Sequence, residues 1–314
     1  MADESANAQP SALRTIGDTP LVKLMRLPPE GAADVWVKLE YFNPTGSYKD
    51  RMALSVVEGA EARGELAPGG MLVEGTGGST DTSLAFVASV KGYRFKVVSS
   101  DAFAAEKRKS MRAFGAELVI VPSESGKITA DLIAEIMNTA DRISRDEHGY
   151  LTRQFTNPDV PRGYEPMGEE ILRQVGGAPD VFCAGVGTAG MLTGVATALR
   201  RAGAGTRIVA LEPAESPMLT QGRAGPHGVE GIGVGKIPPL LDRALVDEVR
   251  CVAEAAAREM ARALAAQEGI FAGVSSGLNV AAAIEIAREL GAGHTVVTTA
   301  VDSGMKYLAG DLFD

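Results

Sequence analysis

The sequence contains few residues that could cross-link the chain or bind a metal ion. Among its 314 residues there are two cysteines, Cys183 and Cys251, and three histidines, His148, His227 and His294. The cysteines are far apart and lack a CxxC or metal-ligand spacing, so we expect neither a disulfide framework nor a zinc site. The histidines have no acidic or hydroxyl partner at a telling distance in the sequence, which argues against a serine–histidine triad and a histidine metal site. No metal is predicted, and Cys183, inside an apolar run, is predicted to be a core residue rather than a nucleophile.

The sequence also lacks an excess of positive charge and any long apolar run. Lysine and arginine number 31 against 40 aspartates and glutamates, so no basic surface is predicted that could bind nucleic acid. No apolar run approaches the roughly 20 residues that cross a bilayer, so no membrane partner is expected. Residues 1–10 lack the basic start and apolar centre of a secretory signal. With so few cysteines, a cytoplasmic location is predicted.

Length and composition predict a globular protein of two domains. A chain of 314 residues is too long to fold around one small hydrophobic core, and domains of about 150 residues are typical. The polar residues 1–12 are predicted to be a mobile tail. A loop over 156–163, TNPDVPRG, is taken as the boundary region, so the predicted lobes are 13–155 and 156–314. Because the sequence ends at Asp314, we expect no appended regulatory domain.

Apolar periodicity alternates between strand and helix along most of the chain. This alternation predicts parallel strands with crossover helices, and hence an α/β fold of two open, twisted, mostly parallel sheets flanked by helices. The predicted strands are 20–24, 35–39, 71–74, 95–99, 118–122, 181–185, 207–212 and 295–301, and the predicted helices are 52–60, 80–91, 104–114, 130–145, 192–202, 253–267 and 279–290.

Residues 43–51, NPTGSYKDR, place Lys49 near the start of a predicted helix. The positive end of the helix dipole disfavours a cation there, and a lysine whose charged form is disfavoured becomes a nucleophilic amine. Such a lysine suits Schiff-base chemistry. On this stretch alone, an exposed cluster of Lys49, Asp50 and Arg51 on the first helical turn is the competing interpretation.

Two glycine-rich loops each stand between a predicted strand and a predicted helix. Residues 74–80, EGTGGST, and 185–190, GVGTAG, would direct backbone N–H groups and a helix N-terminus at one point, which is how proteins bind anions. One loop would hold a carboxylate and the other a phosphate, although glycines that only allow tight turns give the same pattern. The second loop also fits GxGxxG, with Glu212 about 20 residues further on, so an NAD-dependent oxidoreductase is an alternative. That alternative leaves the first loop and Lys49 without roles.

Two further glycine-rich groups lie in the second half of the chain. Residues 230–235, EGIGVG, fall in no predicted helix and are interpreted as a loop that closes on a ligand. Residues 272–277, AGVSSG, precede the helix predicted from Asn279, and Ser275 or Ser276 is predicted to cap that helix.

Taken in order, these motifs resemble those of the pyridoxal-phosphate enzymes with the tryptophan synthase β-subunit fold (fold type II), and within it the cysteine synthase and cystathionine β-synthase group. The resemblance extends from 17–22, GDTPLV, to 302–307, DSGMKY, and the order of the motifs is more specific than any single one. It implies pyridoxal 5'-phosphate as cofactor, bound in the cleft between the two lobes.

The resemblance also assigns individual residues. Lys49 matches the lysine that holds the cofactor as a Schiff base, and Ser303 matches the hydroxyl beside its pyridine nitrogen. A hydroxyl, unlike a carboxylate, does not keep that nitrogen protonated, so elimination at Cβ is favoured over transamination. The other assignments are Gly187, Thr188, Ala189, Gly190 and Met191 around the cofactor phosphate, Ser79 at the cofactor, Thr76, Gly77, Gly78, Ser79 and Thr80 at the substrate α-carboxylate, and Gln154 and Gly231 on the substrate side.

Three residues of these loops depart from the family's pattern. Ser79 stands where an asparagine is common, Asp81 replaces a glycine, and Met191 replaces a hydroxyl residue. Serine can still donate a hydrogen bond, with shorter reach, whereas Met191 removes one phosphate contact. Asp81 is predicted to satisfy N–H groups at the helix start, and the alternative is a charge near the substrate pocket that discourages anionic co-substrates.

We therefore predict an enzyme for β-replacement on O-acetyl-L-serine or O-phospho-L-serine, with sulfide as the leading nucleophile. Lys49 would remove the α-proton and return it, while the loop at 76–80 would close over the substrate. A lyase of the cysteine desulfhydrase or serine dehydratase type is the main alternative. The oxidoreductase and a catalytically silent binding scaffold are more remote. The resemblance implies a homodimer that binds a small amino-acid substrate.

Overall fold

The structure is a computed structural model that describes residues 11–124, 126 and 129–314. Most of the predicted tail, residues 1–12, therefore lies outside the described residues. Its last two residues lead into a short 3-10 helix, η2 (Ala12–Thr15), where the Ser11 hydroxyl accepts a hydrogen bond from the Leu13 N–H. None of the helices in this described part of the chain is both long and apolar enough to cross a membrane.

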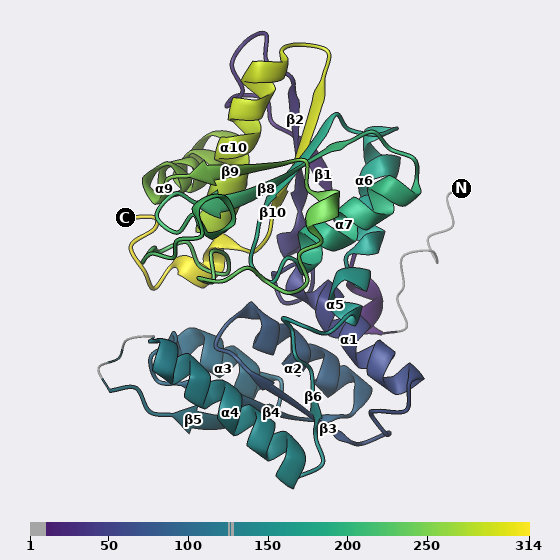
Figure 1. Ribbon diagram of the computed structural model, residues 1–314, viewed down its shortest axis with the longest axis vertical. Helices are drawn as coiled ribbons and strands as arrows, with labels where there is room; N and C mark the ends of the chain where they lie inside the picture. Colours follow the sequence, from purple (N-terminus) through teal and green to yellow (C-terminus); the bar gives the residue numbers. More distant parts are fainter. Residues whose placement is uncertain (1–10, 125, 127–128) are drawn as a thin grey trace. The chain divides into compact units, whose positions relative to one another are not determined.

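The described chain divides into two compact units, and each has its own sheet (Figure 1). Both sheets are mostly parallel and flanked by helices, which confirms the predicted α/β fold class. The first unit contains the described residues up to Asp18 with Asn43–Thr45 and Lys49–Thr152, and the second contains Thr19–Phe42, Gly46–Tyr48 and Arg153–Asp314.

The first unit contains strands β3 (Met71–Gly75), β4 (Arg94–Ser100), β5 (Glu117–Val121) and β6 (Tyr150–Leu151), and helices α1 (Lys49–Ala62), α2 (Ser79–Lys91), α3 (Ala105–Ala113) and α4 (Ala130–Asp146). The strands are parallel, in the order β5-β4-β3-β6. Successive side chains alternate between the two faces, so Leu72 and Val97 pack with α1 and α2 whereas Val73 and Val98 pack with α4. Figure 1 shows α4 in front of these strands.

Helix ends in this unit follow local backbone chemistry. The Thr129 hydroxyl caps α4 by accepting a hydrogen bond from the Leu132 N–H at 3.2 Å. Helix α2 ends at Gly92, whose φ of +77° is the left-handed conformation that glycine adopts without strain. Thr129 and Gly92 thus fix where α4 begins and where α2 ends.

The second unit contains strands β1 (Leu21–Lys23), β2 (Asp34–Leu39), β7 (Val181–Gly185), β8 (Arg207–Pro213), β9 (Glu248–Val252) and β10 (Thr295–Ala300). They form one sheet in the order β1-β2-β10-β7-β8-β9, in which only the β1–β2 pair is antiparallel among these described strands. Residues 20–39, predicted within the N-terminal lobe, instead supply β1 and β2 to this sheet. The reason is that β2 pairs with β10 along its whole length.

Two helix pairs flank this sheet. Helices α6 (Glu165–Val175) and α7 (Gly190–Arg201) pack together, as do α9 (Glu254–Ala263) and α10 (Val274–Leu290), and Figure 1 shows the pairs on opposite sides of the strands. Helices α9 and α10 approach closely at Gly277, where a Cβ would lie only 2.0 Å from the Ala257 carbonyl oxygen. The absence of a side chain at Gly277 makes this approach possible. Shorter elements are η3 (Glu40–Phe42), α5 (Asp159–Arg162), α8 (Met218–Gln221), η4 (Arg243–Leu245), the π-helical η5 (Leu264–Glu268) and η6 (Gly304–Tyr307).

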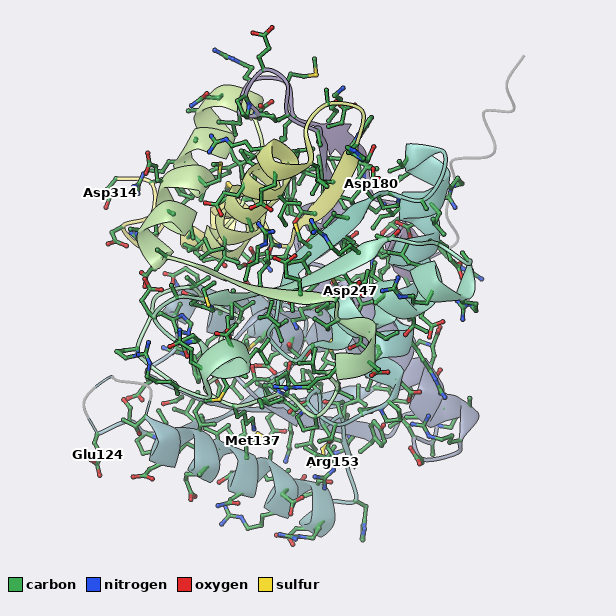
Figure 2. The ribbon with its side chains drawn as sticks, turned by 45° about the horizontal axis from the view of Figure 1, so that its top comes forward. Glu124, Met137, Arg153, Asp180, Asp247 and Asp314 are labelled. Atoms are coloured by element: carbon green, nitrogen blue, oxygen red, sulfur yellow. The ribbon has the colours of Figure 1, made fainter. Side chains whose placement is uncertain are left out.

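Two aspartates labelled in Figure 2 connect the beginnings of neighbouring strands in this sheet. The Asp180 carboxylate accepts a hydrogen bond from the Thr295 N–H at 2.7 Å, and the Asp247 carboxylate accepts one from the Ile208 N–H at 2.6 Å. His294 lies 3.0 Å from Asp180, and this hydrogen bond lowers the pKa of Asp180 below its usual value. His294 therefore has an acidic partner that the sequence did not indicate, and the pair joins strands.

The strands and helices predicted from periodicity are all present, although their ends differ. The structure adds β6, β9 and α6, which were not predicted. Helix α10 begins at Val274 rather than at Asn279. The predicted capping by Ser275 or Ser276 is wrong, because both lie inside α10 and the Ser276 hydroxyl instead accepts a hydrogen bond from the Val301 N–H at 3.0 Å.

Candidate active site

Lys49 is the first residue of α1, and its side chain is buried. The next residue, Asp50, fixes the turn into the helix, since its carboxylate accepts the Thr45 N–H at 2.8 Å and the Thr45 hydroxyl at 2.6 Å. The Thr45 hydroxyl in turn lies 3.2 Å from the Ser83 hydroxyl of α2. The alternative of an exposed charge cluster is wrong, because Lys49, Asp50 and Arg51 are only 7%, 0% and 4% exposed. A buried amine on a fixed helix start is suited to chemistry rather than to solubility.

The segment Gly46–Tyr48, which directly precedes Lys49 in the chain, is fixed within the second unit. The Tyr48 N–H donates to the Val301 carbonyl at 2.9 Å, and the Ser303 N–H donates to the Gly46 carbonyl at 3.0 Å. Gly46 has a φ of +71°, and a Cβ on it would lie 3.4 Å from the Cβ of Ser303. The backbone therefore holds this segment beside Ser303.

The Ser303 hydroxyl is oriented by the helix that it caps. It accepts a hydrogen bond from the Met305 N–H at 3.2 Å, at the start of η6. A hydroxyl that accepts one hydrogen bond can still donate its own proton, so Ser303 can donate to a ring nitrogen. Beside it, the Tyr307 hydroxyl donates to Asp302 at 2.8 Å. Burial, followed by the charges of Asp302 and Glu230, raises the pKa of Tyr307 well above its usual value, which keeps that donor protonated.

The predicted carboxylate loop joins β3 to α2 in the first unit. Helix α2 begins at Ser79, and the N–H of its N-cap, Gly78, donates to the Thr76 hydroxyl at 3.2 Å. The N–H groups of a first helical turn have no intrahelical partner and are available to an anion. Gly77 lies against Phe103, because a Cβ there would be 2.1 Å from the ring. Only glycine fits at this position without displacing Phe103.

Thr80 and Asp81 continue the first turn of α2, and both are buried. Neither carboxylate oxygen of Asp81 has a hydrogen-bond partner within the described chain. The prediction that Asp81 satisfies N–H groups at the helix start is therefore wrong. Burial, followed by the charge of Glu74 at the end of β3, raises the pKa of Asp81 well above its usual value.

The predicted phosphate loop joins β7 to α7 in the second unit. Helix α7 begins at Gly190, whose N–H donates to the Thr188 hydroxyl at 3.3 Å. The residue before it, Ala189, has a φ of +67°, a conformation uncommon for residues with a side chain. Met191 is buried and contributes no hydrogen-bond donor from its side chain. An anion at this loop would thus be bound by backbone N–H groups at the start of α7.

The phosphate loop is in direct contact with the glycine-rich loop at 230–235. A Cβ on Gly187 would lie 2.1 Å from the Gly231 carbonyl oxygen. The Gly233 N–H donates to the Val186 carbonyl at 3.1 Å. The structure thus brings together two of the motifs predicted to bind ligands, although they are more than 40 residues apart in the sequence.

His227, which precedes the loop at 230–235, is hydrogen-bonded to that loop. Its Nδ1 accepts a hydrogen bond from the Val229 N–H at 3.2 Å, so the ring proton is on Nε2. That Nε2 donates to the Gly233 carbonyl at 3.0 Å. This histidine therefore orients a backbone segment, which its sequence context did not reveal.

Gln154 lies in the turn that follows β6, and its side chain is buried. The turn is closed by a hydrogen bond of 2.9 Å from the Thr156 N–H to the Arg153 carbonyl. The neighbouring residue Phe155 has the Lys236 amine 4.9 Å from its ring centroid. Gln154 is thus adjacent in the chain to a residue that contacts the segment after the loop at 230–235.

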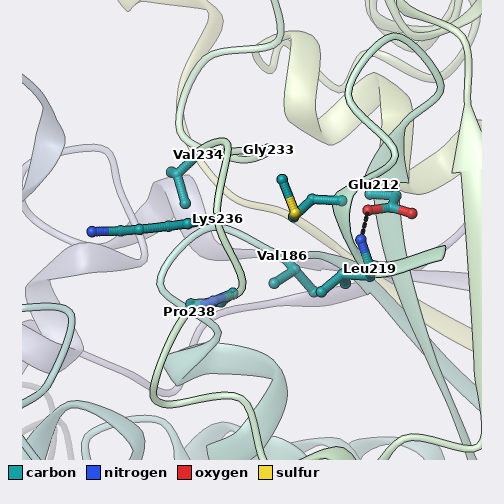
Figure 3. Close-up of a pocket in the computed structure, with 8 residues that line it drawn as sticks. Val186, Glu212, Leu219, Gly233, Val234, Lys236 and Pro238 are labelled. Atoms are coloured by element: carbon teal, nitrogen blue, oxygen red, sulfur yellow. Dashed lines mark hydrogen bonds between the residues drawn. The ribbon is translucent and has the colours of Figure 1, made fainter. Parts of the chain in front are cut away.

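Glu212, the acid that the oxidoreductase alternative requires for a ribose, is engaged elsewhere. It is buried at the end of β8, and its carboxylate accepts hydrogen bonds from the Leu219 N–H at 2.6 Å, the Thr220 N–H at 3.0 Å and the Thr220 hydroxyl at 2.7 Å. Figure 3 shows the Leu219 contact beside a cavity of about 10 Å³, which is room for about one water molecule. Glu212 therefore positions α8.

Comparison with known proteins decides between the alternatives. The family described as "Pyridoxal-phosphate dependent enzyme" matches residues 12–302 of this chain. The chain belongs to this family. Pyridoxal 5'-phosphate is accordingly its cofactor, and the NAD-dependent oxidoreductase alternative is wrong.

Curated relatives extend over nearly the whole chain. O-ureido-L-serine synthase of Streptomyces lavendulae is 44% identical over 306 residues, which are 97% of this chain and 92% of that protein. Cysteine synthase of Staphylococcus aureus is also 44% identical, over 302 residues that make up 95% of each protein. The similarity to the cysteine synthase group is therefore confirmed.

Solved structures give the same result for the fold. A crystal structure of O-ureido-L-serine synthase aligns with a TM-score of 0.90 at 43% identity, covering 98% of this chain and 96% of the other. Cysteine synthase of Entamoeba histolytica aligns with a TM-score of 0.92 at 34% identity, covering 100% and 93%. A hydrogen sulfide-producing enzyme of Fusobacterium nucleatum aligns with a TM-score of 0.88 at 34% identity, covering 96% and 98%.

The described side chains and loops fit this cofactor. An aldehyde that carries a phosphate and a pyridine ring requires an amine, an anion site and a hydrogen-bond partner for the ring nitrogen. Lys49 is a buried amine, the start of α7 supplies N–H groups, and Ser303 supplies a hydroxyl proton. Gly187 leaves the phosphate loop without a side chain at its closest approach to the backbone of Gly231.

Several residues that organise these loops were not found from the sequence. Asn279 is the clearest case, because its side-chain oxygen accepts the Gly185 N–H at 2.7 Å while its amide donates to the Thr299 carbonyl at 2.9 Å. Thr45, Phe103 and His227 act in similar ways on other segments. Their signals are single polar or aromatic residues without a repeating pattern, so only three-dimensional contacts identify them.

Cys183 agrees with its predicted place in the core. It is fully buried in β7, and burial raises the pKa of its thiol to about 12. The thiol therefore stays protonated at neutral pH and is a poor nucleophile. Within the described part of the chain, no group of three or more histidine, cysteine, aspartate or glutamate side chains is arranged to hold a metal ion.

Proposed function

We propose that this enzyme catalyses β-replacement on an O-activated L-serine, either O-acetyl-L-serine or O-phospho-L-serine, with sulfide or another small nucleophile. The observation that carries this proposal is the buried Lys49 at the start of α1, in a chain whose 44%-identical relatives are named for L-serine derivatives substituted at Cβ. Cysteine carries sulfur at this carbon, and O-ureido-L-serine carries an oxygen-linked group. A shared replacement reaction at Cβ accounts for both names.

Lys49 is the acid–base residue of the proposal. When bound, the cofactor stabilises negative charge at the substrate Cα, which makes the α-proton removable. The Lys49 amine takes that proton from Cα, and the Cβ–O bond then breaks to release acetate or phosphate. Lys49 returns the proton to Cα once the nucleophile has added at Cβ. The Thr45–Asp50 hydrogen bonds fix the backbone at the start of α1, so the Lys49 side chain extends from a fixed position.

Three further groups bind and orient in this proposal. The loop Gly187, Thr188, Ala189, Gly190 and Met191 binds the cofactor phosphate through backbone N–H groups. Ser303 donates its hydroxyl proton to the ring nitrogen, and Ser79 contacts the cofactor. The substrate α-carboxylate binds at the loop Thr76, Gly77, Gly78, Ser79 and Thr80, while Gln154 and Gly231 line the substrate side. The N–H groups at the starts of α2 and α7 support both anion sites.

A β-elimination lyase is the second candidate. The similarity to a hydrogen sulfide-producing enzyme at 34% identity favours it, because release of sulfide from an amino acid is the reverse of sulfide addition at Cβ. The two candidates differ in whether a nucleophile or water completes the reaction. Product analysis in the presence and absence of sulfide distinguishes them.

The proposal includes a cytoplasmic homodimer. Two cysteines in 314 residues, with Cys183 buried and Cys251 exposed, are what a reducing compartment permits. The mass of one chain is 32.7 kDa, so sedimentation at low micromolar concentration should give about twice this value. A single species at the mass of one chain would contradict the dimer.

The test begins with the absorption spectrum of the purified protein. We expect a visible band that survives gel filtration, and borohydride reduction should attach the cofactor covalently to the peptide containing Lys49. Lys49→Ala should abolish the covalent product and the replacement reaction with O-acetyl-L-serine and O-phospho-L-serine. Lys109→Ala, at an exposed position of α3, is the matched control and should retain both.

Pyruvate formation separates the two reactions. With sulfide present, the replacement reaction gives cysteine and little pyruvate. Pyruvate released at the same rate with and without sulfide would support elimination and contradict the synthase proposal. Retention of covalent labelling and activity in Lys49→Ala would contradict the proposed role of Lys49 itself.

A further inference from the structure

Asp81 is a buried carboxyl group that the proposed mechanism does not use. It is 0% exposed in the first turn of α2, and neither of its oxygens has a hydrogen-bond partner among the described residues. A charged carboxylate in such a place loses its hydration with little compensation, which is strongly unfavourable. The protonated form of Asp81 is therefore favoured over the ionised form, unless a neighbouring group stabilises the negative charge.

The neighbouring acid makes the charged form still less favourable. Glu74 is 1% exposed, and its carboxylate accepts the Gly75 N–H at 2.9 Å and the Thr152 hydroxyl at 2.5 Å. Burial and then the Glu74 charge raise the pKa of Asp81 well above its usual value, while the nearby Thr76 hydroxyl and Gly78 N–H oppose this only in part. Two buried acids thus flank the loop at 76–80 in the sequence, and at least one of them has reason to stay protonated.

Several charged groups on the other elements packed against α2 interact with partners of their own. Asp50 on α1 is bonded to Thr45, Lys96 on β4 to Glu147, and Arg108 on α3 to the Ser100 carbonyl. Arg14 on η2 and Lys49 and Arg51 on α1 are further cations on elements that pack against α2. The charge that raises the pKa of Asp81 is that of Glu74.

We propose that Asp81 is a positioning residue for the substrate α-carboxylate, which the loop at 76–80 binds only while Asp81 is protonated. The inference rests on the role of that loop in the proposed function. Gly78, the N-cap of α2, and Thr76 belong to this loop and lie beside the Asp81 carboxyl group. A neutral Asp81 leaves the N–H groups of the first turn of α2 able to attract an anion. An ionised Asp81 places a buried negative charge beneath the same groups and opposes the substrate.

The direction of the pH effect follows from this arrangement. Because the folded protein favours the protonated acid, Asp81 is neutral at low pH and ionises as the pH rises through its raised pKa. Affinity for an α-carboxylate therefore falls with rising pH. A full charge at short range in a partly buried site should weaken binding by about tenfold or more.

The experiment measures binding of L-alanine, which has an α-carboxylate but no leaving group at Cβ. Its dissociation constant is obtained from the change in the visible absorption of the holoenzyme between pH 5 and pH 10. Asp81→Asn has nearly the same shape as the wild-type residue and cannot ionise. The protonation of free L-alanine depends on pH in the same way in both experiments. The ratio of the two dissociation constants therefore reports the effect of Asp81 alone. We expect this ratio, wild type over Asp81→Asn, to rise by about tenfold across the range.

A second variant tests the pairing of the two acids. Glu74→Gln removes the charge that raises the pKa of Asp81, so the loss of affinity should begin at a lower pH than in the wild type. A purely structural role of Glu74 would change affinity without moving the transition. Asp131→Asn replaces an exposed acid in the first turn of α4 and should leave the whole profile unchanged.

A direct observation of the proton completes the test. The infrared difference between wild type and Asp81→Asn should show a protonated carboxylic acid band at the lower end of the pH range. The inference is overturned if the ratio of dissociation constants is constant from pH 5 to pH 10, or if that band is absent at pH 5. Failure of the proposed function looks different, since the wild type would then show no cofactor band or no response of that band to amino acids.

Discussion

Gly187 and Gly231 lie so close together that a Cβ on Gly187 would be 2.1 Å from the carbonyl oxygen of Gly231. Contacts with backbone atoms cannot be relieved by rotating a side chain. The phosphate loop and the loop at 230–235 therefore form one unit of structure, in which each limits how far the other can move.

Gly187→Ala should for this reason weaken cofactor binding. Overpacking against a fixed backbone typically costs 1–3 kcal/mol, so we expect the dissociation constant for pyridoxal phosphate to rise by about tenfold or more. Titration of the apoprotein with cofactor measures this constant. Gly205→Ala is the matched control, because a Cβ there would meet no atom within 4 Å. Equal affinities of the two variants would contradict the argument.

Gly77→Ala should act on the substrate rather than on the cofactor. A Cβ at this position would lie 2.1 Å from the ring of Phe103, so either the ring or the carboxylate loop must shift. We expect KM for the activated serine to rise by about tenfold, with cofactor affinity little changed.

The double variant Gly77→Ala/Phe103→Ala provides the check, since removal of the ring makes room for the new methyl group. KM should return toward the wild-type value, measured in the same steady-state assay. Persistence of the full defect in the double variant would show that Phe103 is not the cause.

Asn279→Leu should destabilise the protein at the end of β7, where the phosphate loop begins. Asn279 satisfies the Gly185 N–H, the Thr299 carbonyl and the Thr299 hydroxyl in a buried place, and leucine satisfies none of them. Buried polar groups left unpaired cost about 1–3 kcal/mol each, so the loss of a partner for three such groups should lower the free energy of unfolding by about 3 kcal/mol or more. Urea unfolding measures it, and Asn138→Leu, at an exposed position of α4, should change it by less than about 0.5 kcal/mol.

Lys38→Met should destabilise the protein because it separates a buried ion pair. The Lys38 amine lies 2.6 Å from the Glu170 carboxylate, with side-chain exposures of 0% and 6%. It also donates to the Thr19 carbonyl at 2.5 Å and to the Gln174 side chain at 2.9 Å. Its loss leaves Glu170 charged and buried, which costs about 3–5 kcal/mol in the free energy of unfolding.

The double variant Lys38→Met/Glu170→Leu should recover most of that loss, because no uncompensated charge then remains buried. Arg145→Met interrupts an exposed pair with Asp141 and serves as the control, with an expected change below about 1 kcal/mol. A double variant as unstable as Lys38→Met would indicate that packing, rather than charge, decides the effect. Urea unfolding at one pH is sufficient for all three.

Asp81→Asn should stabilise the protein by an amount that grows with pH. An unfolded aspartate titrates near pH 3.9, whereas burial raises the pKa of Asp81 in the folded protein. The folded wild type thus binds the proton more tightly, and its free energy of unfolding falls as pH rises between the two values, by up to about 1.4 kcal/mol per pH unit. Asparagine has no such slope. Urea unfolding of both proteins at pH 5, 7 and 9 should show a widening difference, and a constant difference would refute the raised pKa.

The alternation of strand, glycine-rich turn and helix was predictable because buried parallel strands and their crossover helices impose distinct apolar periods on the sequence. The glycine loops were predictable for the same reason, since they follow a strand directly. Strand β6 was missed because it has only two residues. Strand β9 was missed because it is an edge strand in which only Val252 is buried. Residues 20–39 were misplaced because pairing of β2 with β10 joins segments more than 250 residues apart.

The site was predictable only where a motif carries its own chemistry. Lys49 stands out through its turn and helix start, yet its burial could not be read from a Lys-Asp-Arg run that resembles an exposed charge cluster. Asp81 resembles an ordinary helix-start acid, and only the structure shows that its oxygens lack partners in the described chain. Asn279 and Thr299 are 20 residues apart, so their hydrogen bonds have no local signal in the sequence.

The hydrogen bonds from the Tyr48 N–H to the Val301 carbonyl and from the Ser303 N–H to the Gly46 carbonyl join backbone atoms, which almost every amino acid provides. These two bonds therefore do not require a particular side chain at position 48 or 303. Proline at position 48 or 303 would remove a donor, and a side chain at position 46 would be strained by its φ of +71°. The position at which the chain enters α1, and with it the proposed role of Lys49, is thus set by the peptide backbone.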